Sequence, residues 1–590
     1  MSGPTIRFSS MALSISAIGA ALLLYWTGIY GSDVSVFHVL CLTLIVLLAF
    51  MCTSSSMPSG LVVSSLLVVL VVLWVFPNAS YVQPVLYNSD QYTEWRIVQH
   101  LLMDGHLPQL IGRTRLTYYS TFPGLELLTT SLNLIAGVSA RDFLNYGGAV
   151  LGSITVLLAL IFYRRLLPQR SLATSAIVVA AFSVSMIAYE ALAIHETLSL
   201  VFVCLALVGL ALGRESPLQA AMLFGIAGLA IVVSHILTGF GFLLLIAVYA
   251  VCTWILKRHL VHDRQMIQSH HLLLRLSASL LLLYGTTYLA WNAMMSTENV
   301  RMGYSTMLAV LSAPWSEYAT VSVIPGRGNR PVWMTALAFL GFGSYGLVTL
   351  AGLLVSIRSE LSKLAALIPI GLSGGAIFLM LYLVPFGGTP SAGIQWRGFL
   401  YAYLFGAPLF VVGLRFVSTR KPPVRLPRIF HTRVLPLLII AVVLSPTVYY
   451  GVPLFMYDKT SPLTAADIRL GYAAEHGAYV FASGYSSTPH VVAVQIAANI
   501  ERASDPDPMT GVVILYIREF VPGRYDSVGD LVRGQCSTMI IRQSITRVPD
   551  RGYTVSMADY EYLLMVSNVV YSSGDPLVLS VTYCASGITY

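Results

Sequence analysis

Charged residues are scarce in this sequence. Asp, Glu, Lys and Arg together make up 10% of its 590 residues, whereas hydrophobic residues make up 56%. Soluble globular chains carry roughly 25% charged residues, so a water-soluble globule is excluded. Apolar runs of about 18–22 residues recur over the first three quarters of the chain, and each is long enough to cross a hydrocarbon core as a helix. The sequence therefore predicts a polytopic α-helical membrane protein.

Ionisable side chains are almost absent from the interiors of these apolar runs, and the sequence has no long internal repeat. Ion-coupled transporters usually place ionisable groups near the middle of the bilayer and are built from repeated halves. Both absences argue against a transporter or flippase of a lipid-linked substrate, which we keep as an alternative function.

Cysteine is also rare, with six residues in the whole chain. Four of them fall in apolar runs, where a small buried thiol is the default interpretation, and Cys536 and Cys584 fall in the C-terminal region. Spacing alone leaves open whether these two form a disulfide. The apolar run at residues 11–30 lacks a strongly basic start, so we expect a retained first span rather than a cleaved signal peptide.

Basic residues outnumber acidic residues, 34 to 26, but no basic surface falls on a soluble domain, which excludes a nucleic-acid partner. The basic residues cluster instead in short connections between the apolar runs. If the N-terminus is cytoplasmic, every cluster falls on the cytoplasmic side, as the positive-inside rule requires. The clusters are Arg164, Arg165 and Arg170; Lys257, Arg258 and Arg264; Arg358 and Lys363; and Arg420, Lys421, Arg425, Arg428 and Arg433.

The apolar pattern predicts about 13 transmembrane helices, an odd number that leaves the C-terminal region extracytoplasmic. We divide the chain into N-terminal transmembrane helices (1–76), a first large outer loop (77–141), a transmembrane core (142–455) and an extracytoplasmic α/β domain (456–590). The expected spans are 11–30, 35–53, 60–76, 142–163, 172–189, 196–213, 218–234, 237–256, 272–293, 333–356, 364–384, 398–417 and 434–454.

Two regions outside these spans have a predicted structure. In the outer loop, the short apolar stretch that follows Pro123 and ends near Gly137 is expected to be a helix at the membrane interface. In the C-terminal region, strand-length apolar runs alternate with helical stretches, which is typical of a small α/β domain. The expected strands are 478–482, 512–516, 539–541 and 577–581, and the expected helices are 464–475 and 557–566.

The first candidate for chemistry is acidic and follows the third expected span. Asp90 and Glu94 are four residues apart, so on a helix both carboxylates share one face. A carboxylate held just outside the bilayer is suited to act as a general base toward a hydroxyl group. The alternative is structural, with Asp90 as a helix N-cap and Glu94 as a favourable residue of the first turn.

The second candidate lies in the next short outer connection and contains Glu190, His195 and Glu196. A histidine beside a glutamate is suited to bind a metal ion or to orient a phosphate, although two residues do not complete a metal site. The alternative is that these are ordinary interfacial polar groups. Ser234 and His235, at another outer helix end, are interpreted as packing or hydrogen-bonding residues.

The third candidate is basic. Arg397 follows Gln395 and Trp396 where an outer loop enters a span, and Arg327 and Arg330 lie in an earlier outer segment. A guanidinium group matches two oxygens of a lipid phosphate, and its charge is unfavourable at this depth without such a partner. The alternative is an arginine that extends to the interface beside an aromatic belt.

Together these features resemble the GT-C superfamily of integral membrane glycosyltransferases, which includes protein O-mannosyltransferases and oligosaccharyltransferases. The match spans most of the chain but rests on short motifs, and residues 560–575 are similar to the ending of many prokaryotic, especially archaeal-type, members. The chain lacks the Trp-Trp-Asp-x-Gly signature of oligosaccharyltransferases, which argues against block transfer of an oligosaccharide. The motifs are Asp90 at the start of the first outer loop, the helix start Phe122-Pro123-Gly124-Leu125, Glu196 or less well Glu190 in the next outer connection, and Arg397 at a late span.

The resemblance implies an inverting transfer of a sugar from a polyprenyl-phosphate donor to a protein, lipid or glycan acceptor at the outer face of the cell membrane. It implies that Asp90 acts as the general base, with Glu94 as a second catalytic candidate. Three further roles follow from it. Arg397, with Arg327 and Arg330, is expected to bind the phosphate, and His195, Glu196 and Glu190 to support the acceptor or a divalent cation (Mg or Mn), which the superfamily does not require throughout. A non-catalytic scaffold of the same fold in envelope assembly is the alternative function.

Overall fold

The structure is a computed structural model. It describes residues 121–167, 169–181, 194–212, 216–259, 264–295, 332–358, 367–383 and 392–418, together with short pieces between residues 62 and 107, Val442, and four strands beyond residue 480. The chain divides into two compact units, of which the first comprises residues 1–80, 113–325 and 331–456, and the second comprises residues 81–112, 326–330 and 457–590.

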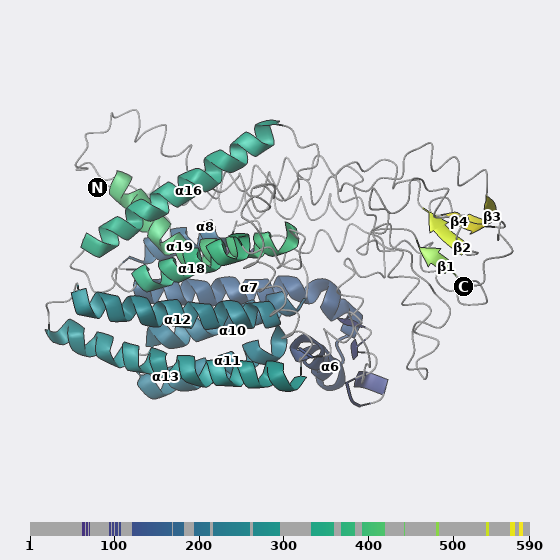
Figure 1. Cartoon of the computed structure of the whole chain (residues 1–590), viewed down its shortest axis with the longest axis horizontal. Helices are drawn as coiled ribbons and strands as arrows, with labels where there is room; N and C mark the ends of the chain where they lie inside the picture. The colour runs from purple at the N-terminus through teal and green to yellow at the C-terminus, as the bar shows by residue number, and fades with distance from the viewer. Residues whose placement is uncertain are drawn as a thin grey trace, which may run out of the picture. The chain divides into compact units, whose positions relative to one another are not determined.

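The first unit is built from long apolar helices, many of which run side by side (Figure 1). Each described helix coincides with an expected span or with the expected interfacial helix. The helices are α6 (Gly124–Ala136), α7 (Ala140–Leu166), α8 (Arg170–Ala181), α10 (His195–Leu212), α11 (Pro217–Ser234), α12 (Ile236–His259), α13 (Arg264–Met295), α16 (Val332–Arg358), α18 (Leu367–Leu383) and α19 (Ala392–Ser418). The expected spans 11–30 and 35–53 lie outside the described residues.

Within the described residues, the length and composition of four helices suffice to cross a membrane: α7, α10, residues Leu340–Ile357 of α16 and residues Gly398–Val417 of α19. The apolar parts of α8, α11, α12 and α18 are shorter. A group of helices this long and apolar confirms the prediction of a polytopic helical membrane protein.

Helix α6 covers the stretch for which a short helix was expected. It begins directly after Pro123 and ends at Gly137, whose φ of +66° places it in the left-handed region. The main-chain N–H groups of Gly137 and Val138 donate to Asn133 and Leu132, which closes the last turn. Leu125 and Thr129 are buried, whereas Leu134 and Ile135 are exposed. The predicted position of α6 at the membrane interface stays a prediction.

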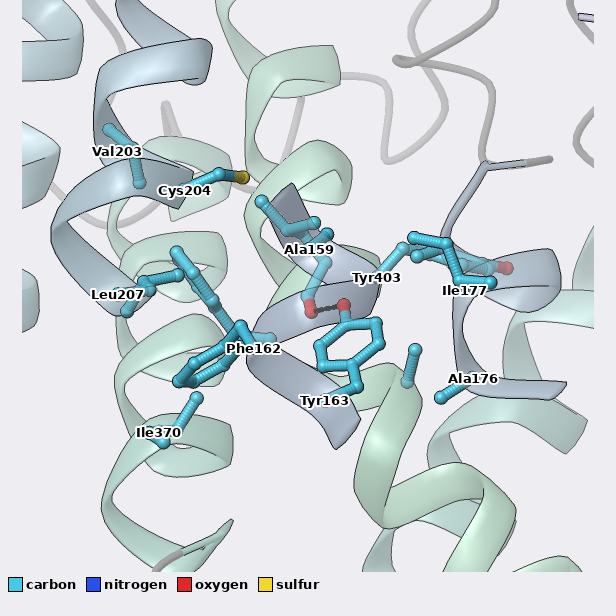
Figure 2. Close-up of a cluster of buried hydrophobic side chains, with 14 of the residues drawn as sticks. Ala159, Phe162, Tyr163, Ala176, Ile177, Val203, Cys204, Leu207, Ile370 and Tyr403 are labelled. Atoms are coloured by element: carbon cyan, nitrogen blue, oxygen red, sulfur yellow. Dashed lines mark hydrogen bonds between the residues drawn. The ribbon is translucent and has the colours of Figure 1, made fainter. Parts of the chain in front are cut away.

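Helix α19 has a proline in its interior, and a tyrosine from α7 repairs the resulting defect. Pro408 has no N–H, so the carbonyl of Leu404, four residues earlier, loses its partner within the helix. The hydroxyl of Tyr163 donates to that carbonyl in the buried core (Figure 2). The hydroxyl of Tyr345 on α16 donates to the carbonyl of Ala402, two residues before Leu404, at 2.9 Å. Inside a membrane, a freed carbonyl requires such a donor because no water is available.

The close approach of α16 and α19 depends on glycine. A Cβ atom on Gly352 of α16 would overlap the carbonyl of Leu409, and one on Gly413 of α19 would overlap the carbonyl of Val348. Small residues at such crossings allow helix backbones to pack directly against each other.

The described part of the second unit includes a four-stranded sheet with the order β1-β2-β4-β3. Strand β1 (Val480–Ala482) is parallel to β2 (Thr538–Ile541), and β4 (Leu577–Val581) is antiparallel to both β2 and β3 (Ser567–Ser572). The expected strands at 478–482, 539–541 and 577–581 are confirmed, whereas β3 was not expected. The expected strand 512–516, the expected helices of this region, Cys536 and Cys584 lie outside the described residues.

Candidate functional site at the ends of α6, α10 and α12

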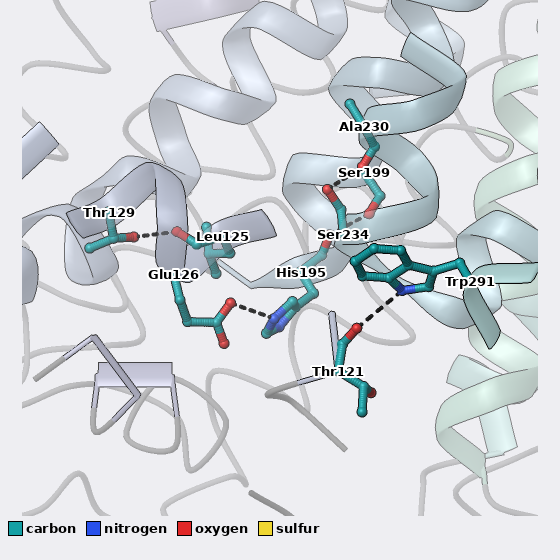
Figure 3. Close-up of polar contacts among 9 residues, drawn as sticks. All are labelled: Thr121, Leu125, Glu126, Thr129, His195, Ser199, Ala230, Ser234 and Trp291. Carbon is teal, nitrogen blue, oxygen red and sulfur yellow. Dashed lines mark hydrogen bonds and ion pairs between the residues drawn. The ribbon is translucent and has the colours of Figure 1, made fainter. Parts of the chain in front are cut away.

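A buried carboxylate meets a buried imidazole between α6 and α10. Glu126 is the third residue of α6 and His195 is the first residue of α10, and Oε2 of Glu126 lies 2.9 Å from Nε2 of His195 (Figure 3). Glu126 is 0% exposed and His195 is 3% exposed. The other carboxylate oxygen of Glu126, Oε1, has no hydrogen-bond partner among the described residues. Two ionisable groups are therefore held in contact away from water.

A second pair of this kind lies beside the first. Glu196, the next residue of α10, has Oε1 3.8 Å from Nε2 of His235, and both side chains are buried. His235 is the single extended residue between α11 and α12, with φ −162° and ψ 127°. Its Nδ1 accepts the main-chain N–H of Thr238 at 3.1 Å and lies 2.8 Å from the Thr238 hydroxyl oxygen. The imidazole thus caps the first turn of α12.

The start of α6 is held against these helices by close packing. A Cβ atom on Gly124 would lie 2.5 Å from Oγ and 3.0 Å from Cα of Ser234, the last residue of α11. Only glycine permits this approach, because any side chain there would enter the space occupied by Ser234. Nε1 of Trp291 on α13 donates to the main-chain oxygen of Thr121 at 3.2 Å, just before α6 (Figure 3).

Tyrosines of α13 fix the start of α12 in a similar way. The hydroxyl of Tyr288 donates to the carbonyl of Ile236 at 3.0 Å, and the hydroxyl of Tyr284 donates to the carbonyl of Gly239 at 2.9 Å. Ile236 and Gly239 lie on either side of Thr238, whose N–H is capped by His235, so both ends of this turn are bonded to α13. The His/Glu cluster (Glu126, His195, Glu196 and His235) is therefore built on rigid helix ends.

Burial of two carboxylates is unfavourable unless they are compensated. His195 and Glu196 occupy the first turn of α10, where the main-chain N–H groups point out of the helix and favour negative charge. The imidazole of His195 lies within hydrogen-bond distance of Glu126, and the imidazole of His235 lies at ion-pair distance from Glu196. The arrangement is suited to hold a polar substrate group or to move a proton, because ionisable groups in a protein interior respond strongly to a nearby charge.

Of the residues predicted from the sequence, the structure brings His195 and Glu196 together in this cluster. Arg397 falls inside α19, which begins at Ala392. The expected boundary at residue 398 was set by hydropathy, whereas the helix continues through the polar residues before it because backbone hydrogen bonding requires no apolar side chain. The Arg397 side chain lies outside the described part of the structure.

The remaining predicted residues are Asp90, Glu94, Glu190, Arg327 and Arg330. Glu94 is helical and buried in the second unit. Asp90, Glu190, Arg327 and Arg330 lie outside the described residues. Their predicted roles stay predictions.

Sequence reasoning missed Glu126 and undervalued His235. A glutamate in the first turn of an apolar helix is favoured by the helix dipole, so Glu126 did not stand out in the sequence as a residue with another role. Nothing in the local sequence indicates its contact with His195 on a distant helix. A histidine next to a helix end was expected to form hydrogen bonds, as His235 does. The available clue was that both residues are ionisable and border apolar helices.

The resemblance read from the sequence allows for a divalent cation (Mg or Mn). Among the described residues, no group of three or more His, Cys, Asp or Glu side chains is arranged to hold a metal ion. The His/Glu cluster consists of two separate pairs, and we assign no step to a metal.

Comparison with known proteins identifies the fold. No protein-family model matches the sequence, and no similar sequence is found among curated proteins. Among solved structures, the chain is similar to the Archaeoglobus fulgidus oligosaccharyltransferase tethered with an acceptor peptide that contains the NVT sequon. That comparison has 12% identity and a TM-score of 0.50, and it covers 88% of this chain and 74% of the other.

Two further structures show weaker likeness. One is the oligosaccharyltransferase AglB from Archaeoglobus fulgidus in complex with an inhibitory peptide and a dolichol-phosphate, with 13% identity and a TM-score of 0.48; the match covers 74% of this chain and 63% of that protein. The other is ArnT from Cupriavidus metallidurans bound to undecaprenyl phosphate, with 12% identity and a TM-score of 0.47, covering 90% of this chain and 100% of that one. The chain thus has a fold similar to that of the Archaeoglobus fulgidus oligosaccharyltransferase, which confirms the sequence resemblance to GT-C proteins at the level of the fold.

Proposed function

We propose that this protein is a membrane glycosyltransferase that moves a sugar from a polyprenyl-phosphate donor to an acceptor on the extracytoplasmic side. The observation that carries the proposal is the His/Glu cluster, which places buried ionisable groups at helix ends within a GT-C fold. The oligosaccharyltransferase of similar fold carries an acceptor peptide, which supports an acceptor transfer reaction for this chain as well.

The orientation of the helices supports an outward-facing site. Helix α7 begins next to α6 and carries Arg164 and Arg165 in its last turn. Its 27 residues span about 40 Å at 1.5 Å per residue, so these arginines lie far from the His/Glu cluster. Helix α12 likewise starts directly after His235, and its sequence carries Lys257 and Arg258 close to its end at His259. With these basic ends on the cytoplasmic side, as the positive-inside rule favours, the cluster would lie at the extracytoplasmic side, which supports the proposal.

The proposed reaction is an inverting displacement. Asp90 removes the proton from an acceptor hydroxyl, and the hydroxyl oxygen forms a bond to the anomeric carbon of the sugar. The bond from that carbon to the phosphate oxygen breaks, and polyprenyl phosphate leaves with the electron pair. Arg397, with Arg327 and Arg330, stabilises the negative charge on the leaving phosphate.

Within this reaction the His/Glu cluster supports the acceptor. His195 and Glu196 provide an imidazole and a carboxylate at the start of α10, which suit hydrogen bonding to hydroxyl groups of a sugar or a side chain. Glu94 and Glu190 are further acidic candidates beside Asp90. A divalent cation (Mg or Mn) is not needed for these roles, and no step of the proposed reaction is assigned to one.

The test uses the full-length protein in lipid nanodiscs. We expect it to transfer radiolabel from one of a panel of undecaprenyl- and dolichyl-phosphate monosaccharides to an acceptor in membranes of a deletion strain, with release of the free lipid phosphate. Asp90→Asn should lower the rate at least about 100-fold because the base is lost.

The matched control is Asp142→Asn, which removes an exposed carboxylate from the first turn of α7 and should leave transfer intact. Full transfer by Asp90→Asn would show that the base is wrongly assigned. An absence of transfer from every donor, by folded wild-type protein, would favour the scaffold function instead.

A further inference from the structure

The four members of the His/Glu cluster form two pairs, and α10 contributes the imidazole to one pair and the carboxylate to the other. In the first pair, a carboxylate on α6 faces an imidazole on α10, with Glu126 Oε2 and His195 Nε2 2.9 Å apart. In the second pair, the carboxylate is on α10 and the imidazole precedes α12, with Glu196 Oε1 and His235 Nε2 3.8 Å apart. The neighbouring residues His195 and Glu196 therefore each have a partner on another element.

The hydrogen bonds of His235 determine which of its nitrogens carries the proton. Nδ1 accepts the main-chain N–H of Thr238, so this nitrogen presents a lone pair. In a neutral imidazole the proton then lies on Nε2, the nitrogen that is 3.8 Å from Oε1 of Glu196. The capped turn of α12 consequently fixes both the orientation and the tautomer of the ring that faces Glu196.

The contact of His195 with Glu126 likewise indicates which of its ring nitrogens carries the proton. An ionised carboxylate only accepts hydrogen bonds, so opposite an ionised Glu126 the Nε2 atom of His195 carries a proton and donates it. In the neutral ring the lone pair is then on Nδ1, away from Glu126. A carboxylate that bonds to one ring nitrogen in this way also fixes the orientation of the ring.

Packing alone does not account for Glu126. The adjacent buried positions of α6 are Leu125, which is apolar, and Thr129, whose hydroxyl donates to the Leu125 carbonyl within the helix. An apolar side chain of similar volume would fill the position of Glu126 without the penalty of burying a carboxylate. Its carboxylate also keeps Oε1 without a hydrogen-bond partner among the described residues, which a structural pair would satisfy.

The geometry points to Glu126 and His235 as positioning residues for the two acceptor-supporting groups. Glu126 holds the ring of His195, and His235 holds the carboxylate of Glu196, so that both present fixed polar atoms to the acceptor. This inference rests on the proposed glycosyl transfer and extends its machinery to two residues, from α6 and from the junction of α11 and α12.

Variants that conserve hydrogen bonding test the first pair. Glu126→Gln keeps an oxygen that accepts from His195 but removes the negative charge. His195→Gln keeps an N–H donor near the position of Nε2 but removes the imidazole. We expect Glu126→Gln to lower kcat about 10- to 100-fold, the usual effect of losing such an orienting partner, with KM for the lipid donor changed less than about twofold.

The decisive measurement is the double variant. If Glu126 acts through His195, Glu126→Gln should have no further effect on kcat once His195→Gln is present. The control is Thr129→Val, which removes a buried hydroxyl from the same face of α6 without touching His195. It should leave kcat within about twofold, and the Tm of each variant reports any loss of folding separately.

The second pair is tested by separating capping from positioning. His235→Asn keeps a side-chain oxygen that caps the first turn of α12, but it removes the ring that faces Glu196. We expect kcat to fall about tenfold with Tm unchanged, and no further fall when His235→Asn is added to Glu196→Gln.

Each outcome decides the inference. If the wild-type protein transfers sugar but the effects on kcat are additive, the positioning roles are overturned and the proposed function stands. The same conclusion follows if Glu126→Gln has no effect on kcat. Absence of transfer by the wild-type protein would overturn the proposed function, and the positioning roles with it. Non-additive loss of kcat at unchanged Tm would support both.

Discussion

The helical unit buries polar groups in two regions, and the two regions use different chemistry. At the crossing of α7, α16 and α19, neutral hydroxyl groups of Tyr163 and Tyr345 donate to main-chain carbonyls near Pro408. At the ends of α6, α10 and α12, ionisable side chains face one another in pairs. A neutral donor repairs a defect in the helix at little expense. Burial of carboxylates and imidazoles lowers the free energy of unfolding, so their presence at this site is consistent with a functional role.

The comparison predicts a different response to mutation in each region. Changes at the tyrosine crossing should lower stability while each folded molecule keeps its activity. Conservative changes in the His/Glu cluster should lower activity while stability is kept. Variants that leave a buried ionisable group without compensation, or that displace α6, should lower both.

The largest expected effect follows from removing one member of the buried Glu126–His195 pair. His195→Leu leaves the carboxylate without its donor, and we expect a loss of about 3–5 kcal/mol in the free energy of unfolding. Glu126→Leu combined with His195→Leu should lose less, because no uncompensated charge remains. Reversible unfolding in mixed detergent micelles measures both.

This prediction is contradicted if His195→Leu is no more destabilising than a change at the tyrosine crossing. The ionisable pair would then be energetically ordinary, and the contrast between the two regions would disappear.

The next effect concerns the tyrosine crossing. Tyr163→Phe leaves the buried carbonyl of Leu404 without a donor, and we expect a loss of about 1–3 kcal/mol in the free energy of unfolding. Pro408→Ala restores a main-chain N–H at the position that normally bonds to Leu404, so Tyr163→Phe should lose less than about 1 kcal/mol in that background. Transfer activity per folded molecule should be unchanged in each variant.

A full loss from Tyr163→Phe in the presence of Pro408→Ala would mean that packing of the phenol ring, rather than its hydrogen bond, matters at this crossing. A fall in activity per folded molecule would instead connect the crossing to the reaction.

The fold was predictable from the sequence where a single chemical property determines it. The hydrocarbon core requires long apolar helices, so α7, α10 and α11 begin and end within a few residues of the expected spans. The proline start and glycine end of α6 identified that helix, because each residue has a distinct backbone preference. Strand β3 was missed because its alternation is weak and it is rich in polar residues.

The candidate site was only half predictable. His195 and Glu196 stood out because ionisable residues are rare beside apolar spans. Their partners did not, because Glu126 lies 69 residues before His195, and no local pattern reports a contact between distant helices. The Pro408 defect was visible in the sequence, but its repair by Tyr163 depends on a contact across 241 residues.

A smaller effect is expected from moving α6 without altering its carboxylate. Gly124→Ala introduces a Cβ atom 2.5 Å from Ser234 Oγ, so α6 must shift, and we expect a loss of about 1–2 kcal/mol in the free energy of unfolding. The displacement should also lengthen the Glu126–His195 contact and lower kcat about tenfold. Ser234→Gly removes the obstructing side chain and should recover most of kcat in the double variant.

Failure of Ser234→Gly to recover kcat would indicate that the Ser234 main chain, at 3.0 Å from the added atom, is the real obstacle. Gly124→Ala with wild-type kcat would show that the His/Glu cluster tolerates displacement, contrary to a positioning role for α6.

The smallest effect separates the support of α6 from the chemistry of the cluster. Trp291→Phe keeps an aromatic ring but removes the N–H that donates to Thr121, and we expect a loss of about 1 kcal/mol in the free energy of unfolding. Because Gly124 and the Glu126–His195 contact still hold α6, kcat should stay within about twofold. If Trp291→Phe lowered kcat as much as Glu126→Gln does, the position of α6 rather than the charge on Glu126 would govern the reaction, and the two regions would differ in degree rather than in kind.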